Sequence, residues 1–335
     1  DRTGRRIRAL WYLLKLIGPM MKLVIQIPAW NEEEHLAEAI AALPREVTGF
    51  DRVEILVVDD GSDDRTATVA REAGARVVRL PVHRGLAVAF AAGIDAALER
   101  GADVIVNTDA DGQYDARDIP TLTAPILTGD AQMVIGDRQV HTIRHFSATK
   151  KLLQKLGSWV VRKISRTDVV DATSGFRAIS REAALKLHVF TRFTYTLETI
   201  LQAGEAGLKV VSVPVRTRAE ETRPSRLFRS NTGYVLRSLE SIARIVVLYN
   251  PLRIFLRIGA LPVIVGLALL GRFLYYYLTG QGPAGHVQSL ILAVILITVG
   301  VQVWVVGVVA DLIAVNRRLL EEAVERQREG LGRDR

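Results

Sequence analysis

Two acidic residues stand close together at the end of an apolar run, in the stretch DVIVNTDADGQYD (103–115). The three β-branched residues VIV favour a buried strand, and Asp109 and Asp111 follow it with one residue between them. If the strand continues, side chains two residues apart point to the same side. Carboxylates held so close repel each other unless a positive charge lies nearby. A divalent cation, Mg²⁺ or Mn²⁺, fits because it takes one or two carboxylates together with substrate phosphates.

Gln113 could add a neutral oxygen to such a metal site. The stretch also comes close to a calcium-binding loop, with Asn107 in the first place and Asp118 in the twelfth. That loop requires a helix running directly into its first position, whereas Gly101 ends the preceding helical pattern and a strand intervenes. An acid-rich turn exposed to solvent is the third alternative. We favour the Mg²⁺ or Mn²⁺ site.

A second acid-rich motif, VVDDGSDDRT, follows an earlier apolar run. Ser62, Asp63 or Asp64 could cap the next helix. Capping does not explain Asp59 and Asp60 at the strand end, and one of them could accept hydrogen bonds from a nucleobase or from ribose hydroxyls. The sequence has no Gly-x-Gly-x-x-Gly and no Walker motif, so it supports neither a dinucleotide site nor a P-loop.

The elements that must position these residues are short β-branched runs that alternate with helical patterns from Lys22 onward. This alternation predicts an α/β fold with a mostly parallel sheet and helices on both faces. Ligands of such sheets bind at the carboxyl ends of the strands. Polar segments follow four of the predicted strands, namely PAWNE (28–32), DDGSDD (59–64), DADGQ (109–113) and GDR (136–138). We expect them to converge on one crevice.

The bulk composition limits the classes of partner. The chain has 335 residues, which favours two structural parts, and a net charge of +8, which suits phosphates, nucleic acid or a membrane surface. The positive charge concentrates beside apolar segments and no aromatic-basic stacking platform is present, so we do not expect nucleic acid as a partner. There is no cysteine, which excludes disulfides and thiolate chemistry.

The last third of the chain is largely apolar. Residues 287–310 carry no charge and are long enough to cross a hydrocarbon core of ~30 Å. Residues 255–279 are a weaker candidate, because they contain Arg257 and Arg272, and a buried soluble hairpin is the alternative. The loop TGQGPAGH lacks Lys and Arg whereas both outer flanks are rich in Arg. The positive-inside rule then places the catalytic part and both termini in the cytoplasm, with the chain in the plasma membrane as a multi-pass protein.

The expected organisation has five parts. They are a basic amphipathic segment (1–20), a catalytic domain (21–230), an interfacial amphipathic helix (231–251), two transmembrane helices within 252–314 (about 255–279 and 287–311) and a basic cytoplasmic tail (315–335). Residues 1–20 could equally be an extension upstream of a start at Met20 or Met21.

Five motifs in order and spacing carry a resemblance to a known family. They are IPAWNEE, VVDDGSDDRT, NTDADGQYDARDIP, GDR and DATSGFRAIS. Together they resemble the family 2 nucleotide-sugar glycosyltransferases of the GT-A fold, and most closely the dolichol-phosphate mannose synthases and bacterial polyprenyl-phosphate glycosyltransferases. The resemblance covers about residues 22–230. It departs from the family at His83, where Asn is usual, and at RPSR in the later basic stretch.

The resemblance implies roles for individual residues. It implies a nucleotide site of Pro28, Trp30, Glu32, Asp59, Asp60, Asp109, Ala110, Arg138 and Arg223, and a metal site of Asp109, Asp111 and Gln113. It implies catalytic roles for Asp109, Asp111, Arg138, Asp171 and Arg226, with Arg223, Ser225 and Arg226 in a closing loop and Asp171, Ser174 and Arg177 toward the acceptor.

The resemblance also implies a reaction, which is inverting transfer of a hexose from a nucleoside diphosphate (GDP-mannose or UDP-glucose type) to a dolichyl, undecaprenyl or other polyprenyl phosphate. A phosphate monoester has a second pKa of ~6, so this acceptor needs no strong general base. One alternative is a membrane-anchored transferase that acts on a non-lipid or glycan acceptor. Others are a processive polysaccharide synthase, whose Gln-x-x-Arg-Trp motif is absent, and a non-catalytic scaffold, against which the intact acidic set argues.

Overall fold

The computed structural model describes residues 20–139, 148–189, 195–217, 251–279 and 287–333. The chain divides into two compact units, one formed by residues 1–234 and 325–335 and the other by residues 235–324. Each unit is described by itself below. Of the expected amphipathic segments, 1–20 lies outside the described residues except for Met20, and 231–251 lies outside them except for Pro251.

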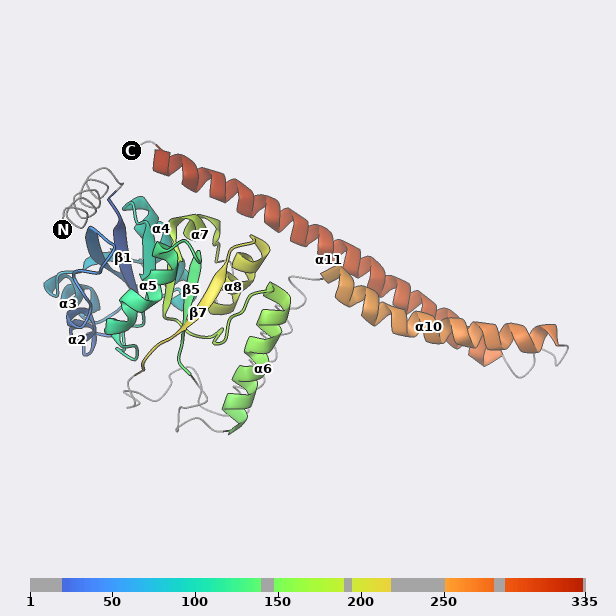
Figure 1. Cartoon of the computed structure of the whole chain (residues 1–335). Coiled ribbons are helices and arrows are strands. Elements are labelled where there is room, and N and C mark those ends of the chain that lie inside the picture. The colour runs from blue at the N-terminus through green and yellow to red at the C-terminus, as the bar shows by residue number, and fades with distance from the viewer. Residues whose placement is uncertain (1–19, 140–147, 190–194, 218–250, 280–286, 334–335) are drawn as a thin grey trace, which may run out of the picture. The chain divides into compact units, whose positions relative to one another are not determined.

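The first unit, which holds the expected catalytic domain, contains one seven-stranded sheet (Figure 1). Its strands are β1 (Lys22–Ala29), β2 (Arg52–Asp59), β3 (Arg76–Arg79), β4 (Val104–Asn107), β5 (Met133–Asp137), β6 (Arg177–Ser180) and β7 (Val210–Pro214). They lie in the order β3-β2-β1-β4-β6-β5-β7, and β6 alone runs antiparallel to its neighbours. The expected mostly parallel α/β sheet is therefore confirmed.

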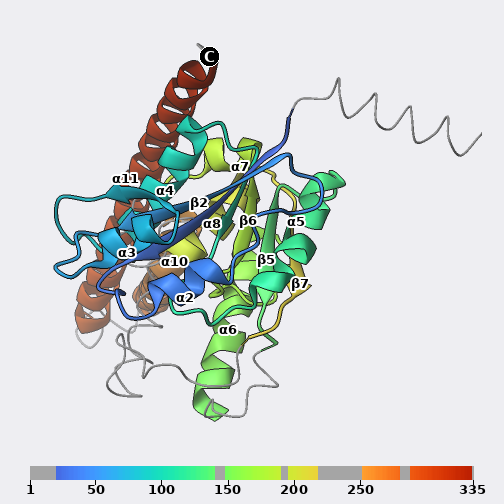
Figure 2. The ribbon, with the colours of Figure 1, turned by 90° about the vertical axis from the view of Figure 1, so that its left-hand side faces the viewer.

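Helices cover both faces of this sheet (Figure 2). They are α2 (Leu36–Ala41), α3 (Thr66–Glu72), α4 (Leu86–Glu99), α5 (Ile119–Leu127), α6 (Ala148–Ser165), α7 (Arg181–Lys186) and α8 (Tyr195–Glu205), with a 3-10 turn η1 at Ala116–Asp118. Helices α2, α3 and α5 contribute to the core on one face. Helices α4 and α8 meet on the other, where the rings of Phe90 and Tyr195 stack at 4.2 Å.

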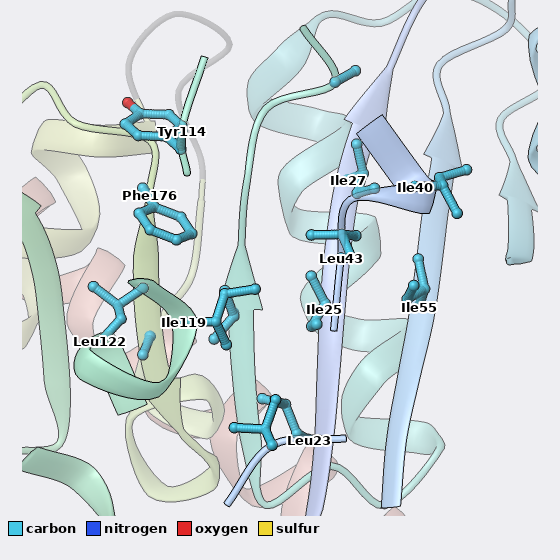
Figure 3. Close-up of a cluster of buried hydrophobic side chains, with 14 of the residues drawn as sticks. Leu23, Ile25, Ile27, Ile40, Leu43, Ile55, Tyr114, Ile119, Leu122 and Phe176 are labelled. Atoms are coloured by element: carbon cyan, nitrogen blue, oxygen red, sulfur yellow. The ribbon is translucent and has the colours of Figure 1, made fainter. Parts of the chain in front are cut away.

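Alternation along β1 explains why the sheet needs both layers. Leu23, Ile25 and Ile27 join the core under α2 and α5, as Figure 3 shows. Gln26 turns the other way and donates to the carbonyl of Phe90 in α4 at 3.5 Å. The three core side chains are fully buried, and each burial contributes roughly 1.5–3 kcal/mol. The central strands are thus fixed on both sides, and their carboxyl ends are held in a defined row.

The second unit contains two long helices, α10 (Pro251–Leu278) and the part of α11 (Val287–Arg333) that precedes residue 325. Residues Pro251–Leu278 and Val287–Arg317 have peak mean hydropathies of 2.2 and 2.6 and could cross a membrane. The helix α11 continues as far as Arg333, so the expected cytoplasmic tail (315–335) is helical up to that residue.

Glycines let α10 and α11 approach each other closely. A Cβ on Gly300 would lie 2.7 Å from the carbonyl oxygen of Gly259, and a Cβ on Gly266 would lie 2.9 Å from that of Ala293. The indole of Trp304 also donates to the carbonyl of Leu256 at 3.0 Å. Small residues at a helix contact are typical of packing inside lipid.

Candidate active site

The loops after β1 and β2 are tied together by their own side chains. Asn31 has a left-handed backbone (φ 53°), which Asn tolerates better than most residues. Its N–H donates to Ser62 Oγ at 3.0 Å, and its side-chain oxygen accepts from the N–H of Asp63 at 3.0 Å. Ser62 and Asp63 therefore do not cap α3 as expected, whereas Asp64 accepts from the N–H of Thr66 at 2.9 Å. These hydrogen bonds between the two loops hold the backbone beside Trp30 in place.

Trp30 lies at the carboxyl end of β1 and stacks on His83, with ring centroids 4.1 Å apart and planes inclined by 23°. The Nδ1 atom of His83 lies 2.9 Å from Asp60 Oδ2. Asp60 also accepts from the backbone N–H groups of Arg84 and Gly85, at 2.9 and 2.7 Å. The loop after β3 is thus held to the end of β2 by one carboxylate.

Asp59 was expected as the alternative reader of a nucleobase, and its surroundings argue against that role. The residue is fully buried. Its Oδ1 accepts from the N–H of Ser62 at 3.0 Å, and its Oδ2 lies 3.2 Å from Nε of Arg79. Asp60 is nearly as buried, and its described contacts are those with the loop after β3. Both carboxylates therefore support the loops around Trp30.

The Asp109–Asp111 pair does not lie on a strand. The strand β4 ends at Asn107, so the expectation that strand geometry aligns the two side chains is wrong. Asp111 instead folds back, and its Oδ1 accepts from the N–H of Gln113 at 2.9 Å. Burial and the neighbouring charge of Asp111 raise the pKa of Asp109 to about 6. The pair therefore carries negative charge that its protein neighbours do not fully offset.

A network that the sequence analysis did not identify joins β1, β4 and Gly175, and Gly175 lies against Asp109. Gln26 donates to Asn107 Oδ1 at 2.9 Å, and Asn107 donates to the carbonyl of Gly175 at 2.7 Å. The N–H of Gly175 donates to the hydroxyl of Tyr114 at 3.1 Å. The sequence does contain an indication of this network, because Gln26 and Asn107 are polar residues in strands that are otherwise largely apolar.

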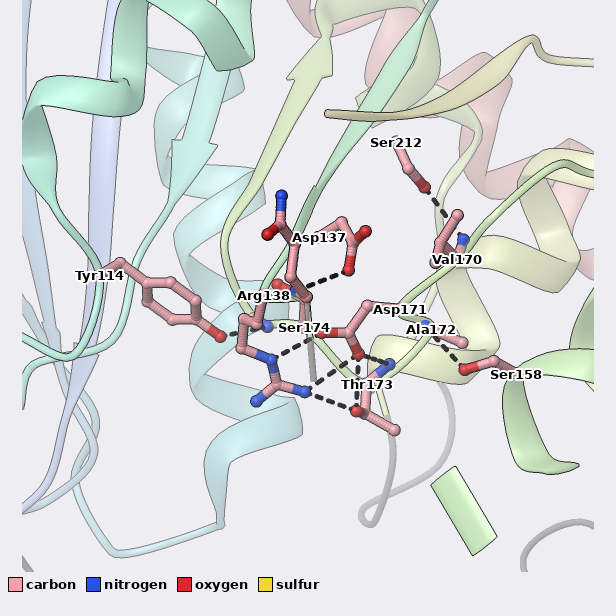
Figure 4. Close-up of polar contacts among 12 residues, drawn as sticks. Tyr114, Asp137, Arg138, Ser158, Val170, Asp171, Ala172, Thr173, Ser174 and Ser212 are labelled. Atoms are coloured by element: carbon pink, nitrogen blue, oxygen red, sulfur yellow. Dashed lines mark hydrogen bonds and ion pairs between the residues drawn. The ribbon is translucent and has the colours of Figure 1, made fainter. Parts of the chain in front are cut away.

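Arg138 and Asp171, both candidate catalytic residues, form an ion pair (Figure 4). Arg138 donates from Nε and Nη2 to the two carboxylate oxygens at 2.7 and 3.0 Å, and from Nη2 to Thr173 Oγ1 at 2.7 Å. Burial would raise the pKa of Asp171, but the charge and hydrogen bonds of Arg138 outweigh it and hold the pKa below its ordinary value. The guanidinium is therefore locked in orientation at the end of β5.

Arg177 was expected near the acceptor, but it is fully buried. It donates to the carbonyls of Ser174 at 2.8 Å and Ala172 at 3.1 Å, and to Thr199 Oγ1 at 2.7 Å. Burial lowers its pKa to about 10. Its role in this structure is to hold the segment before β6 against α8, rather than to contact a ligand. Ser174 is also fully buried.

Asp118, the twelfth residue of the calcium-loop alternative, binds Arg216 with both of its carboxylate oxygens. Its Oδ2 accepts from the N–H of Arg216 at 2.6 Å, and its Oδ1 accepts from Nε of the same residue at 3.0 Å. Tyr114 also forms a β-bridge with Thr217. A strand, not a helix, enters the loop at Asn107. Both observations argue against a calcium loop.

A pocket of about 620 Å³ adjoins the acidic pair. It lies between α2 and the loop after β4, and its lining includes Asp109, Asp111, His35, Glu38, Arg117 and Arg216. Trp30 and Asp60 do not line it. The polar groups at the carboxyl edge therefore form two neighbouring regions, this pocket and the ring pair at the ends of β1 and β3.

The remaining candidates are placed as follows. Pro28 and Ala110 are buried at the ends of β1 and β4, and the N–H of Glu32 donates to Thr66 Oγ1 at 2.9 Å. The candidates of the expected closing loop, Arg223, Ser225 and Arg226, lie outside the described residues.

Comparisons with known proteins agree with the fold and the motifs. The family model described as "Glycosyl transferase family 2" matches residues 24–187. An uncharacterized glycosyltransferase of Mycobacterium tuberculosis is 35% identical over 64% of this chain and 94% of its own length. A polyprenol monophosphomannose synthase of Mycolicibacterium smegmatis is 29% identical over 64% of this chain and 84% of its own length.

A solved structure is also similar. It is the glucosyl-3-phosphoglycerate synthase of Mycobacterium tuberculosis in complex with Mn²⁺, UDP-glucose and phosphoglyceric acid. The TM-score is 0.51 at 26% sequence identity, and the match covers 66% of this chain and 79% of that chain.

Proposed function

Because the chain belongs to the family 2 glycosyltransferases, we propose that it transfers a hexose from a nucleoside diphosphate to the phosphate of a polyprenyl lipid in a membrane. One observation carries this proposal: the same chain contains the glycosyltransferase domain and two helices that could cross a membrane. A relative named polyprenol monophosphomannose synthase supports the same acceptor class.

The acidic pair fits a divalent metal ion. Asp109 and Asp111 supply hard carboxylate oxygens, and the pKa of Asp109 is raised mainly by burial and further by the charge of Asp111, although Arg138 and Arg177 act against the rise. Among the residues that the structure describes, no three Asp, Glu, His or Cys side chains are grouped as a full metal site. Mg²⁺ and Mn²⁺ suit such a sparse set because they share substrate phosphates as ligands. We assign Asp109 and Asp111 as ligands, with Gln113 as the third candidate.

Charge at the leaving group determines the chemistry. A bound divalent ion would neutralise negative charge on the departing diphosphate. Arg138 is held by Asp171 at the end of β5, which is separated from β4 by β6, and we assign it to a phosphate of the donor or acceptor. A fixed guanidinium costs little reorganisation when charge develops beside it. An acceptor phosphate is anionic at neutral pH, so it can attack the anomeric carbon from the far face and invert it without a strong base.

The membrane arrangement is part of the proposal. Residues 279–286 contain no Lys or Arg, whereas Arg253 and Arg257 lie on one flank and Arg317 and Arg318 on the other. By the positive-inside rule both helices then have cytoplasmic outer ends, and the catalytic unit lies on the cytoplasmic side. The lipid phosphate would be presented at that surface.

A second candidate function is transfer to a soluble phosphorylated acceptor, with the helices serving only as an anchor. The similar solved structure favours it, because that protein is named a glucosyl-3-phosphoglycerate synthase and holds phosphoglyceric acid. Its acceptor also carries a phosphate, so a fixed arginine such as Arg138 suits either class.

The test uses the purified full chain in detergent with Mn²⁺ or Mg²⁺. A short polyprenyl phosphate and radiolabelled nucleotide sugars are supplied, and label is followed into the organic phase. We expect one donor to label the lipid, and chelation of the metal to stop it. Label that enters a phosphorylated soluble acceptor but never the lipid would establish the second candidate instead.

A further inference from the structure

In the proposed reaction two groups act on phosphates, although they do not follow neighbouring strands. Asp109 and Asp111 follow β4, whereas Arg138 follows β5, and β6 lies between these two strands. The distance from a metal ion on the acidic pair to the guanidinium is therefore set by whatever joins the two loops across β6. Group transfer is sensitive to displacements of about 1 Å, so this connection bears directly on the rate.

The segment that enters β6, residues 171–176, contacts both groups. At its start, the Asp171 carboxylate accepts two hydrogen bonds from Arg138, at 2.7 and 3.0 Å. Later in the same segment Gly175 lies against Asp109, because a Cβ there would be 2.9 Å from Oδ1 of that carboxylate. The segment thus lies between the arginine and the acidic pair, and a shift of its backbone would move one relative to the other.

Tyr114 ties the metal loop to this segment. It follows Asp111 in the same loop and is 6% exposed. Its hydroxyl accepts from the N–H of Gly175 at 3.1 Å (Figure 4), and its ring stacks on Phe176 with centroids 5.0 Å apart. Burial raises the pKa of this hydroxyl, and the charge of Arg138 opposes the rise. The hydroxyl therefore stays protonated within range of that guanidinium's charge.

The backbone and ring of Tyr114 are held independently of its hydroxyl. The backbone forms an antiparallel β-bridge with Thr217, and the ring packs on Phe176. Loss of the hydroxyl alone would leave both contacts in place and would leave the buried N–H of Gly175 without this partner. A buried N–H without a partner is costly, so the segment would shift to satisfy it and would carry the wall beside Asp109 with it.

We propose that Tyr114 positions the acidic pair relative to Arg138, through the hydrogen bond between its hydroxyl and Gly175. This inference rests on the proposed function, because it concerns the metal ion and the phosphates of that reaction. Tyr114 is a positioning residue, which acts on Asp109 through Gly175 and on Arg138 through residues 171–176. Phenylalanine at this position would fill the same space and lose the connection.

The test compares Tyr114→Phe with the unaltered full chain in detergent. Mn²⁺ is titrated with UDP or GDP present, and bound Mn²⁺ is measured from the electron paramagnetic resonance signal of the free ion. We expect the Kd for Mn²⁺ to rise about tenfold, as for one lost hydrogen bond. Transfer at saturating Mn²⁺ should stay about fivefold below that of the unaltered chain, because Arg138 remains displaced relative to the metal ion.

Leu122→Ala is the matched control for stability, because Leu122 is fully buried in the same core as Tyr114. It should lower the thermal midpoint at least as much as Tyr114→Phe and leave Mn²⁺ affinity and transfer unchanged. An equal loss of Mn²⁺ affinity in Leu122→Ala would overturn the specific role of Tyr114.

Two further results would overturn the inference and leave the proposed function intact. They are an unchanged Mn²⁺ affinity in Tyr114→Phe, and full recovery of transfer by that variant at saturating Mn²⁺. Failure of the unaltered chain to bind Mn²⁺ or to transfer sugar would overturn the proposed function together with this inference.

Discussion

Gly175 lies directly against the carboxylate of Asp109. A Cβ on Gly175 would be 2.9 Å from Oδ1 of Asp109 and 3.1 Å from the hydroxyl oxygen of Tyr195. The carboxylate is the far end of a side chain, so it can move aside without a change in the backbone. A methyl group at Gly175 would therefore displace the Asp109 carboxylate rather than the backbone.

Gly175→Ala should raise the Mn²⁺ concentration needed for half-maximal transfer, with little change in thermal midpoint. Gly136→Ala is a matched control, because its Cβ would meet a methyl group of Val215 at the same 2.9 Å. That variant should lose stability without any change in metal dependence. Metal titration of activity and thermal melting distinguish the two. An unchanged metal requirement in Gly175→Ala would show that Gly175 does not position Asp109.

Asp111→Ala should reduce transfer by at least about a hundredfold, because a bound metal ion would lose one of the two carboxylates that would hold it. The variant should remain folded, since the one contact described for the Asp111 side chain is with the N–H of Gln113 nearby. Glu46→Ala, at an exposed position, serves as the control. Transfer is measured in detergent with saturating Mn²⁺. Turnover like that of the unaltered chain would refute the metal assignment.

Asp171→Asn should destabilise the catalytic unit by about 3 kcal/mol, because it leaves the guanidinium of Arg138 without its counter-charge in a largely buried place. The double variant Arg138→Met/Asp171→Leu removes both charges and should recover much of that loss. Denaturant unfolding followed by circular dichroism measures both. Equal stability of Asp171→Asn and the unaltered chain would mean that the pair contributes nothing.

The same pair gives an acid dependence with a defined sign. The folded-state pKa of Asp171 lies below its unfolded value of ~3.9. Its contribution to stability is therefore present above that unfolded value and is lost as pH falls through the lower folded pKa. The stability difference between the unaltered chain and Asp171→Asn should shrink in acid. A difference that stays constant down to the acid unfolding of the chain would contradict this.

Gly300→Leu should disrupt the helical hairpin, because a Cβ there would overlap Val263 Cγ2 and would lie 2.7 Å from the carbonyl oxygen of Gly259. Gly271→Leu is the matched control, since a Cβ on Gly271 has no atom within 4 Å. The measurement is the thermal midpoint of the full chain in detergent, with the yield of monodisperse protein as a second reading. Equal behaviour of the two variants would show that the glycine contact does not stabilise α10 on α11.

The sequence predicted the parts of the fold that depend on local pattern. The alternation of strand and helix patterns predicted the mostly parallel sheet. The polar segments after the strands predicted that the site lies at the carboxyl edge of this sheet. The uncharged run at 287–310 led to α11. These features follow from side-chain periodicity and length, which neighbouring residues alone determine.

The site depends on contacts that no local pattern reveals. The hydrogen bond from Asn107 to Gly175 and the ion pair of Arg216 with Asp118 join distant parts of the chain. The burial of Arg177 could not be predicted from the sequence either. An arginine within a motif suggests a ligand-binding group, and only the structure shows that this guanidinium donates to four oxygen atoms of the protein itself. Asp109 and Asp111 line the same pocket, but because β4 ends at Asn107 they do not have the strand geometry that the sequence predicted.

The antiparallel strand β6 begins just after Gly175, and it is inserted between β4 and β5. During synthesis Asp109 and Asp111 are therefore made well before Gly175, against which the Asp109 carboxylate lies. The strand β6 also precedes α10 and α11 in the chain. Every described residue of the site is thus translated before these two apolar helices, so the order of synthesis allows the sheet edge to form ahead of them.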